Sequence, residues 1–199
     1  MYDLEDGRMA IALARAELDR HFKIREIESE KLPEKFSEKS GVFVTLSRFP
    51  SKELRGCIGY VMPVMKLKKA ICDNALNAAL EDPRFPALRK EELDRIVVEI
   101  SLLTVPEKIK YSSPEELLNR IQIGKDGLIM EKSFFKGLLL PQVPVEWGWD
   151  VEEFLSHTCM KAGLSSNTWR KGEVTIKKFS AAVFSEKSPR GKVIEKELL

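Results

Sequence analysis

The segment Leu54-Arg55-Gly56-Cys57-Ile58-Gly59-Tyr60 contains the residues whose types and spacing best suit chemistry. If the segment is an extended strand, its side chains alternate between two faces, and Arg55 and Cys57 share one of them, about 7 Å apart along the backbone. A cation beside a thiol favours the thiolate, which is the nucleophilic form of cysteine. The small residues Gly56 and Gly59 keep both neighbours of the thiol open. The pattern predicts that Cys57 is a candidate nucleophile.

Two interpretations of Cys57 stay open at this point. Most buried cysteines are inert, and Cys57 is then a small apolar side chain packed in a crowded strand. A thiol enzyme also needs a base, and His157 can serve only if the fold brings its helix over this segment. Glycine in a strand marks a bulge or a close approach to the backbone. A bulge would break the alternation that places Arg55 beside Cys57.

Three further side chains are weaker candidates. Glu99 lies in an apolar segment and can pair with Arg55, or it lies on the exposed face of a half-buried strand. Asp82 and Arg84 lie where a helix ends among prolines, so a local ion pair that fixes the turn is the simpler account of both. The candidate set is Cys57, Arg55 and Glu99 for catalysis, and Gly56, Gly59, Asp82 and Arg84 for binding.

The remaining chemistry-bearing residues do not form a metal or cofactor site. Cys72 and Cys159 fall on the apolar sides of two predicted helices, so we expect both in the core. The chain has three cysteines, without a Cys-x-x-Cys pair, and two histidines. Neither a disulfide framework nor a zinc site fits that inventory. Phosphate-loop, dinucleotide and His-Glu-x-x-His patterns are also absent from the sequence, and we expect no metal and no cofactor.

Composition excludes several classes of protein. The 199 residues include 33 basic and 31 acidic ones, a net charge of +2, without the concentrated basic excess of a dedicated nucleic-acid binder. No apolar run approaches the roughly 20 residues that span a bilayer, and the polar start of the chain does not resemble a signal peptide. We therefore expect a cytoplasmic protein of one domain over 1–199, with a motif-bearing core at about 41–184. Residues 186–199 are expected to form a charged, loose tail.

Hydrophobic periodicity and capping signals predict an interleaved set of helices and hairpins. Helices are predicted over 6–22, 66–81 and 150–163, with another beginning at Ser113. Strands are predicted over 42–46, 54–61, 95–104, 121–123, 128–130, 134–140 and 174–184. The turn at 124–127 predicts a hairpin between 121–123 and 128–130. We expect an α/β fold of α+β type, in which helices flank a mixed, largely antiparallel sheet.

Several blocks of the sequence resemble the AMME-syndrome candidate protein family, which is defined by the AMMECR-type domain. The most specific block is LRGCIG, at 54–59. The supporting blocks are DPRFP at 82–86, EISLL at 99–103, GKDGL at 124–128, LPQVP at 140–144, EFL at 153–155 and CMKAGL at 159–164. They run in the family's order from about Gly41 to Trp169, so the resemblance covers nearly the whole chain and identifies it as a microbial member.

The resemblance implies a compact fold of a larger and a smaller lobe, with the Cys57 motif near a cleft. It does not imply a known reaction. Microbial members resemble one component of a set that includes a radical-SAM-type and a Memo-type protein, so proteins of these two types are the expected partners. The implied setting is a nucleotide, RNA or protein modification pathway, although the near-neutral composition supports RNA or nucleotide only weakly.

Two hypotheses of function follow. In the first, the chain is an enzyme or enzyme subunit that uses Cys57, with Arg55 stabilising the thiolate or a bound anion and Glu99 orienting Arg55. In the second, it is a non-catalytic module that holds a protein or RNA partner on the surface of the Leu54–Gly59 hairpin. An exposed Cys57 in a pocket beside Arg55 favours the first hypothesis. A basic or apolar patch around the hairpin, with Cys57 beneath it, favours the second.

Overall fold

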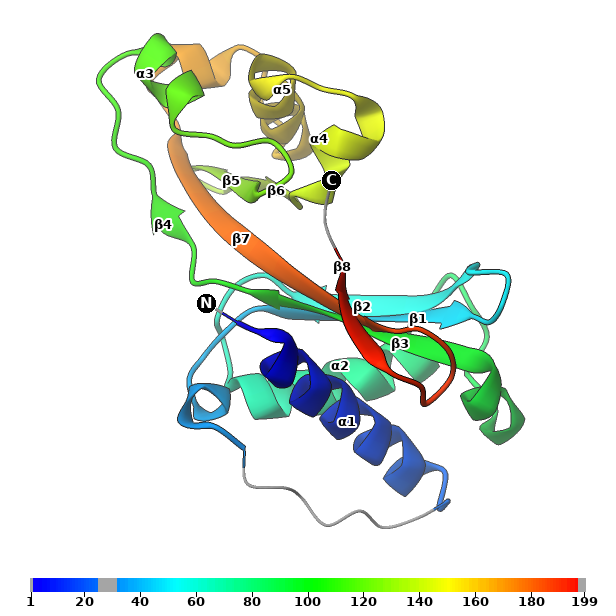
Figure 1. Cartoon of the computed structure of the whole chain (residues 1–199). Helices are drawn as coiled ribbons and strands as arrows, with labels where there is room; N and C mark the ends of the chain where they lie inside the picture. Colours follow the sequence, from blue (N-terminus) through cyan, green and yellow to red (C-terminus); the bar gives the residue numbers. More distant parts are fainter. Residues whose placement is uncertain (1, 25–31, 197–199) are drawn as a thin grey trace. The chain divides into compact units, whose positions relative to one another are not determined.

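The computed structural model describes residues 2–24 and 32–196, which fall into two compact units (Figure 1). Unit 1 comprises the chain up to Leu103 together with Ala182–Lys196, and unit 2 comprises Thr104–Ala181. The architecture is mixed α+β with a largely antiparallel sheet and flanking helices, which confirms the predicted fold class. No helix of the described residues is long and apolar enough to cross a membrane.

Unit 1 is built on a sheet in which the strand order is β2-β1-β3-β7, with β8 on β7. The strands are β1 (Val42–Arg48), β2 (Leu54–Tyr60), β3 (Ile96–Leu103), β7 (Thr175–Glu186), which contributes its end, and β8 (Val193–Lys196). β1 is antiparallel to both β2 and β3. The strands predicted over 42–46 and 54–61 therefore pair as a hairpin, and the predicted core strand at 95–104 is confirmed.

Helices α1 (Leu4–His21) and α2 (Leu67–Leu80) cover one face of this sheet (Figure 1). A capping box at Asp3 begins α1, because a carboxylate there satisfies amides that have no partner within the helix. The fully buried residues that alternate along β1 and β3 point to the helices; they are Val42, Val44, Leu46, Val98, Ile100 and Leu102. Two short 3-10 helices complete unit 1, η1 (Glu34–Ser37) and η2 (Lys90–Arg95).

Unit 2 combines the first part of β7 with short helices and a hairpin. Its elements are β4 (Glu107–Lys108), α3 (Pro114–Asn119), β5 (Asp126–Lys132), β6 (Phe135–Leu139), α4 (Gln142–Trp147), α5 (Val151–Lys161) and η3 (Thr168–Lys171). β5 is antiparallel to both β6 and β7. The core of unit 2 is centred on the fully buried Phe154, Leu155 and Trp169.

Two local predictions are wrong. Residues 121–123 do not form a strand, because the Asp126 carboxylate accepts from the Gln122 amide at 2.9 Å and closes a tight turn before β5. The hairpin in this region instead joins β5 to β6. The prediction of a loose tail over 186–199 is also wrong for residues 186–196, since Glu186 ends β7, β8 returns along it and Arg190 forms ion pairs with Asp19 and Asp94. Residues 197–199 lie outside the described residues.

A buried ion pair ties four elements of unit 1 together, α1, η2, β3 and β7. Arg15 of α1 donates through Nε and Nη2 to the Glu186 carboxylate at the end of β7, at 2.9 and 2.5 Å. The same guanidinium donates to the carbonyl oxygens of Leu93 and Ile96 at 2.8 and 2.7 Å. Glu186 also accepts from the Val98 amide at 2.9 Å. Both charges are therefore compensated by hydrogen bonds as well as by each other, as buried charges require.

Replacing Arg15 by methionine is expected to lower the free energy of unfolding by about 3–5 kcal/mol, because Glu186 would remain as a buried, uncompensated charge. Denaturant unfolding followed by circular dichroism measures the change. The matched control is Arg8→Met on the same helix, where the Arg8–Glu5 pair is largely exposed and its loss costs about 1 kcal/mol or less. Equal losses in the two variants would contradict the structural role of Arg15.

Candidate functional site

A bulge in β2 separates the two side chains that were expected to act together. Cys57 lies opposite Thr45 and Gly56 opposite Leu46, but the next pair is Leu54 with Ser47, so Arg55 is the extra residue. Gly56 therefore shares the helix-facing side with the buried Leu46, and Cys57 points to the other face with Thr45. Arg55 is 2% exposed and reaches η2 on the helix-facing side. The predicted juxtaposition of Arg55 and Cys57 is wrong, because a bulge breaks the alternation.

Cys57 itself is half-buried and engaged through its backbone and its thiol. Its amide donates to Asp82 Oδ2 at 2.8 Å, and its carbonyl oxygen accepts from Arg84 Nη2 at 3.3 Å. The Thr45 hydroxyl donates to Sγ at 3.2 Å. The pKa of Arg84 is raised, chiefly by its hydrogen bond to Asp82 and to a smaller extent by the Cys57 thiol. The cation beside the thiol is therefore Arg84.

Asp82 is the centre of this arrangement. The carboxylate is almost fully buried; it accepts from Arg84 Nη2 at 2.7 Å and Nε at 3.0 Å, and from the amides of Arg84 and Cys57. The hydrogen bond from the Arg84 side chain, followed by those from the two amides, holds the pKa of Asp82 far below its usual range. The predicted local ion pair is confirmed, and it also joins the DPRFP block to the LRGCIG block.

The two glycines of the motif are explained by packing within the chain. A Cβ atom at Gly56 would lie 2.0 Å from the carbonyl oxygen of Ala78 in α2. At Gly59 it would lie 2.4 Å from the ring of Phe43. The prediction that these glycines leave open space beside the thiol is therefore wrong. Gly56 is required because α2 crosses β2 at this residue without room for a side chain.

Glu99 is not brought to Arg55. Glu99 is opposite Thr45 on β3, so it lies two strands from Cys57 on the same face, and its carboxylate pairs with Lys196 at 2.7 Å. The predicted Glu99–Arg55 pair is wrong because the bulge turns Arg55 to the other face of the sheet. His157 belongs to unit 2, where its ring stacks on Trp149 with centroids 3.8 Å apart.

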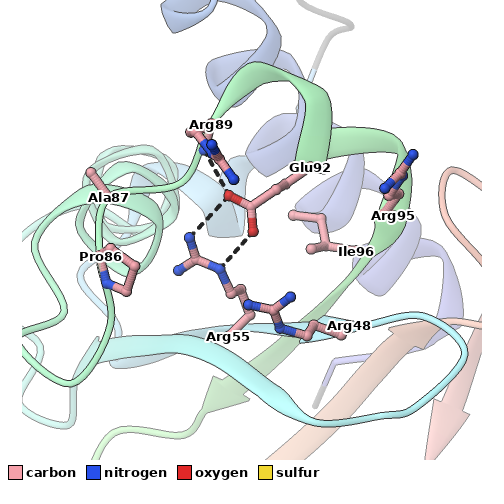
Figure 2. A pocket seen from close by; sticks show the side chains of 8 residues that line it. All are labelled: Arg48, Arg55, Pro86, Ala87, Arg89, Glu92, Arg95 and Ile96. Atoms are coloured by element: carbon pink, nitrogen blue, oxygen red, sulfur yellow. Dashed lines mark hydrogen bonds and ion pairs between the residues drawn. The ribbon is translucent and has the colours of Figure 1, made fainter.

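Arg55 finds its carboxylate partner in η2. Its Nε and Nη2 atoms donate to Glu92 at 2.9 and 3.1 Å, and Glu92 also accepts from the Arg89 amide at 2.9 Å. The hydrogen bond from Arg55 is the main cause that lowers the pKa of Glu92, so this carboxylate is ionised at neutral pH. In the described structure the third nitrogen, Nη1, has no hydrogen-bond partner, and Figure 2 shows it without a dashed line.

Arg55 lines a pocket of about 450 Å³ on this side of the sheet (Figure 2). The lining residues are Arg48, Arg55, Pro86, Ala87, Arg89, Glu92, Arg95 and Ile96. Four arginines against one glutamate give the lining a formal charge of +3. Such a lining attracts anions, and its guanidinium groups match the geometry of carboxylates and phosphates. In the described part of the chain, no group of three or more His, Cys, Asp or Glu side chains is placed to hold a metal ion.

Sequence reasoning missed every member of this pocket except Arg55, including four charged residues. Arg89, Glu92 and Arg95 lie in or beside a short 3-10 helix, and Arg48 ends β1. In the sequence these positions look like an ordinary solvated, charged segment. The one available signal was the spacing of Glu92 three residues after Arg89, which is the spacing of a capping box. That signal marks the start of a helical turn, but it does not indicate what the carboxylate binds.

Comparison with known proteins shows similarity over the full length of the chain. The model of the AMMECR1 family matches residues 11–184. Protein MJ0810 of Methanocaldococcus jannaschii is 53% identical over 196 residues, which cover 98% of both chains. Protein PF1979 of Pyrococcus furiosus is 48% identical over all of this chain and 98% of its own. The crystal structure of the uncharacterized protein PH0010 from Pyrococcus horikoshii has a TM-score of 0.82 at 47% identity and covers 98% of each chain.

Replacing Asp82 by asparagine is expected to lower the free energy of unfolding by about 1–3 kcal/mol at pH 7, because buried donors lose a charged acceptor. The pKa of Asp82 is lower in the folded chain than the value of about 3.9 in an unfolded one. Its stabilisation is therefore complete above the unfolded value and is lost as the pH falls toward the folded value. Urea unfolding between pH 6 and pH 3 should show the wild type approaching the variant, whereas Asp73→Asn, next to Lys69 on α2, should change little. A difference between wild type and Asp82→Asn that stays constant over this range would contradict the assignment.

Proposed function

This chain belongs to the AMMECR1 family, and on that premise we propose that it is a binding module that holds a protein partner through the Arg55 side of the Leu54–Gly59 hairpin. The observation that carries the proposal is the state of Arg55. This buried side chain has a nitrogen without a partner among the described residues, and it lines a pocket with three more arginines. A buried charged donor is costly to leave unpaired, which favours a ligand that completes its hydrogen bonds.

The surroundings of Cys57 support an anchoring role for this residue. Its amide, carbonyl and thiol each contact a neighbouring side chain, and these contacts fix the path of β2. Arg55, the cation that was expected to activate the thiol, pairs with Glu92 instead, and Arg84, the cation that lies beside the thiol, is paired with Asp82. A base, a cation and an open thiol in one pocket would support a thiol enzyme, and the lining of the Arg55 pocket does not include Cys57.

A protein is favoured over RNA as the partner by the distribution of charge. RNA binding rests on several phosphate contacts along a basic groove or stripe. Here the net charge of the chain is +2, and the excess at the site is confined to one pocket. A single focus of charge suits one anionic group on a partner surface. We extend the proposal to the radical-SAM-type and Memo-type proteins that the family resemblance suggests, in the cytoplasm.

Co-purification with purified radical-SAM-type and Memo-type proteins of the same organism tests this proposal. We expect the wild type and Cys57→Ala to retain the partner, and Arg55→Lys to lose about 90% of it, because lysine keeps the charge but cannot supply the fork of donors. Circular dichroism establishes that each variant is folded. Retention of the partner by Arg55→Lys together with its loss in Cys57→Ala would overturn the proposal.

Alkylation with iodoacetamide tests the anchoring role of Cys57 separately. At pH 7 we expect Cys57 to react more slowly than free glutathione, because the thiol is half-buried and bound by Thr45. Cys72 is the internal control, since burial raises its pKa to about 11 and it should react only in strongly alkaline solution. Mass spectrometry of the digested protein gives each rate. A Cys57 that reacts faster than glutathione would instead be an activated nucleophile.

A further inference from the structure

We infer that the arginine pocket of unit 1 is a binding site for a phosphate monoester, with Arg55 as the central ligand and Glu92 as a positioning residue. The inference rests on the proposed function, because it specifies the chemical group that the binding module recognises. The pocket comprises the residues named above around Arg55, all of which belong to unit 1. It lies on the face of the sheet opposite Cys57, so it is independent of any chemistry at the thiol.

The first argument is the number of donors that Arg55 still has available. A guanidinium carries five N–H groups in a fixed plane, and Glu92 takes one from Nε and one from Nη2. The two on Nη1 have no partner among the described residues, although the side chain is 2% exposed. Nη1 is itself buried, so an oxyanion reaches it only when the groups that cover it move aside, and it then accepts from Nη1 without displacing Glu92. The Nη1 side of the Arg55 guanidinium is therefore the place where the ligand binds.

The second argument is the orientation of Arg55 before any ligand arrives. Glu92 holds the guanidinium through two hydrogen bonds, and the Arg89 amide in turn holds Glu92. A side chain fixed in this way loses little rotational freedom when a ligand binds, which favours affinity. The Glu92 carboxylate thus repels the anion in part, but it also positions Arg55, which is the main donor to that anion. It touches Arg55 rather than the ligand, so its role is to position.

The third argument is the charge that remains after Arg55 and Glu92 have paired. Arg48, Arg89 and Arg95 are exposed on the rim of the pocket. Within the described residues none of these three guanidinium groups is in an ion pair, and Arg48 acts on the Glu92 carboxylate only from farther away. Three further cations in the lining suit a ligand with two negative charges better than a carboxylate with one. A phosphate monoester is such a ligand above its second pKa of about 6.

The fourth argument is the size and lining of the pocket. A volume of about 450 Å³ lies within the range of small-molecule sites, and it leaves room beside a phosphate group. Pro86, Ala87 and Ile96 contribute an apolar wall next to the arginines. An inorganic ion would leave that wall without contacts. The ligand is therefore a phosphate attached to an organic body, either a free small molecule or a phosphorylated side chain of the partner.

Isothermal titration calorimetry on the whole chain tests the inference with three probes: inorganic phosphate, phenyl phosphate and a blocked peptide that contains phosphoserine. We expect at least one ester to bind more tightly than inorganic phosphate. Its affinity should fall by about 10- to 100-fold in Arg55→Lys and in Arg89→Gln, which each remove charge-assisted hydrogen bonds. Preference for phenyl phosphate indicates a free ligand, and preference for the phosphopeptide indicates a partner side chain.

Lys90→Gln is the matched control, because Lys90 is exposed in the same 3-10 helix but does not line the pocket. Lys90→Gln should bind the ester with the affinity of the wild type. The affinity of the wild type for the ester should increase between pH 5 and pH 7.5, because the ester loses its second proton in this range. Absence of binding by both esters, or an equal loss in Lys90→Gln and Arg89→Gln, would overturn the inference. Partner capture that still depends on Arg55 would then leave the proposed function standing, whereas capture that depends on Cys57 would overturn the proposed function alone.

Discussion

The ion pair between Arg15 and Glu186 is the interaction on which the rest of unit 1 depends. Arg15 binds the carbonyl oxygens of Leu93 and Ile96 as well as the carboxylate, and these two residues lie in η2 and at the start of β3. A 3-10 helix of six residues has little stability of its own, so its position is set by this guanidinium. Because η2 carries Glu92, the place of the arginine pocket follows from a charge pair that lies wholly inside the protein.

The bulge at Arg55 gives the two faces of one strand different roles. On one face, Cys57 is bound by Thr45, and its backbone is held by Asp82 and Arg84. On the other face, Arg55 is buried and keeps unused donors. In a regular strand the two side chains would share a face, and the guanidinium would lie near the thiol. One inserted residue therefore separates the anchoring contacts of Cys57 from the arginine pocket.

Periodicity was sufficient to predict β1, β2, β3, α1 and α2, because each buries one face and its pattern is local. Periodicity failed at residues 121–123, where the Asp126 side chain competes with strand pairing. It also failed at β8, because the charged sequence of this segment lacks the hydrophobic alternation that is typical of a strand. The pocket could not be predicted, since Arg55 and Glu92 are 37 residues apart and no spacing rule joins them. Family resemblance identified the LRGCIG and DPRFP blocks. It did not indicate that the Asp82 carboxylate would meet the Cys57 amide.

The contact between Asp82 and the Cys57 amide has a consequence for how the protein behaves in a crowded solution. β2 is the last strand in the order of its sheet, and a strand in that position presents amides and carbonyls that can recruit a strand from another molecule. Asp82 and Arg84 occupy the outward amide and carbonyl at Cys57. A second molecule would therefore find no continuous row of hydrogen-bonding groups along β2. The contacts of Asp82 and Arg84 with the Cys57 backbone thus protect the protein against aggregation by sheet extension.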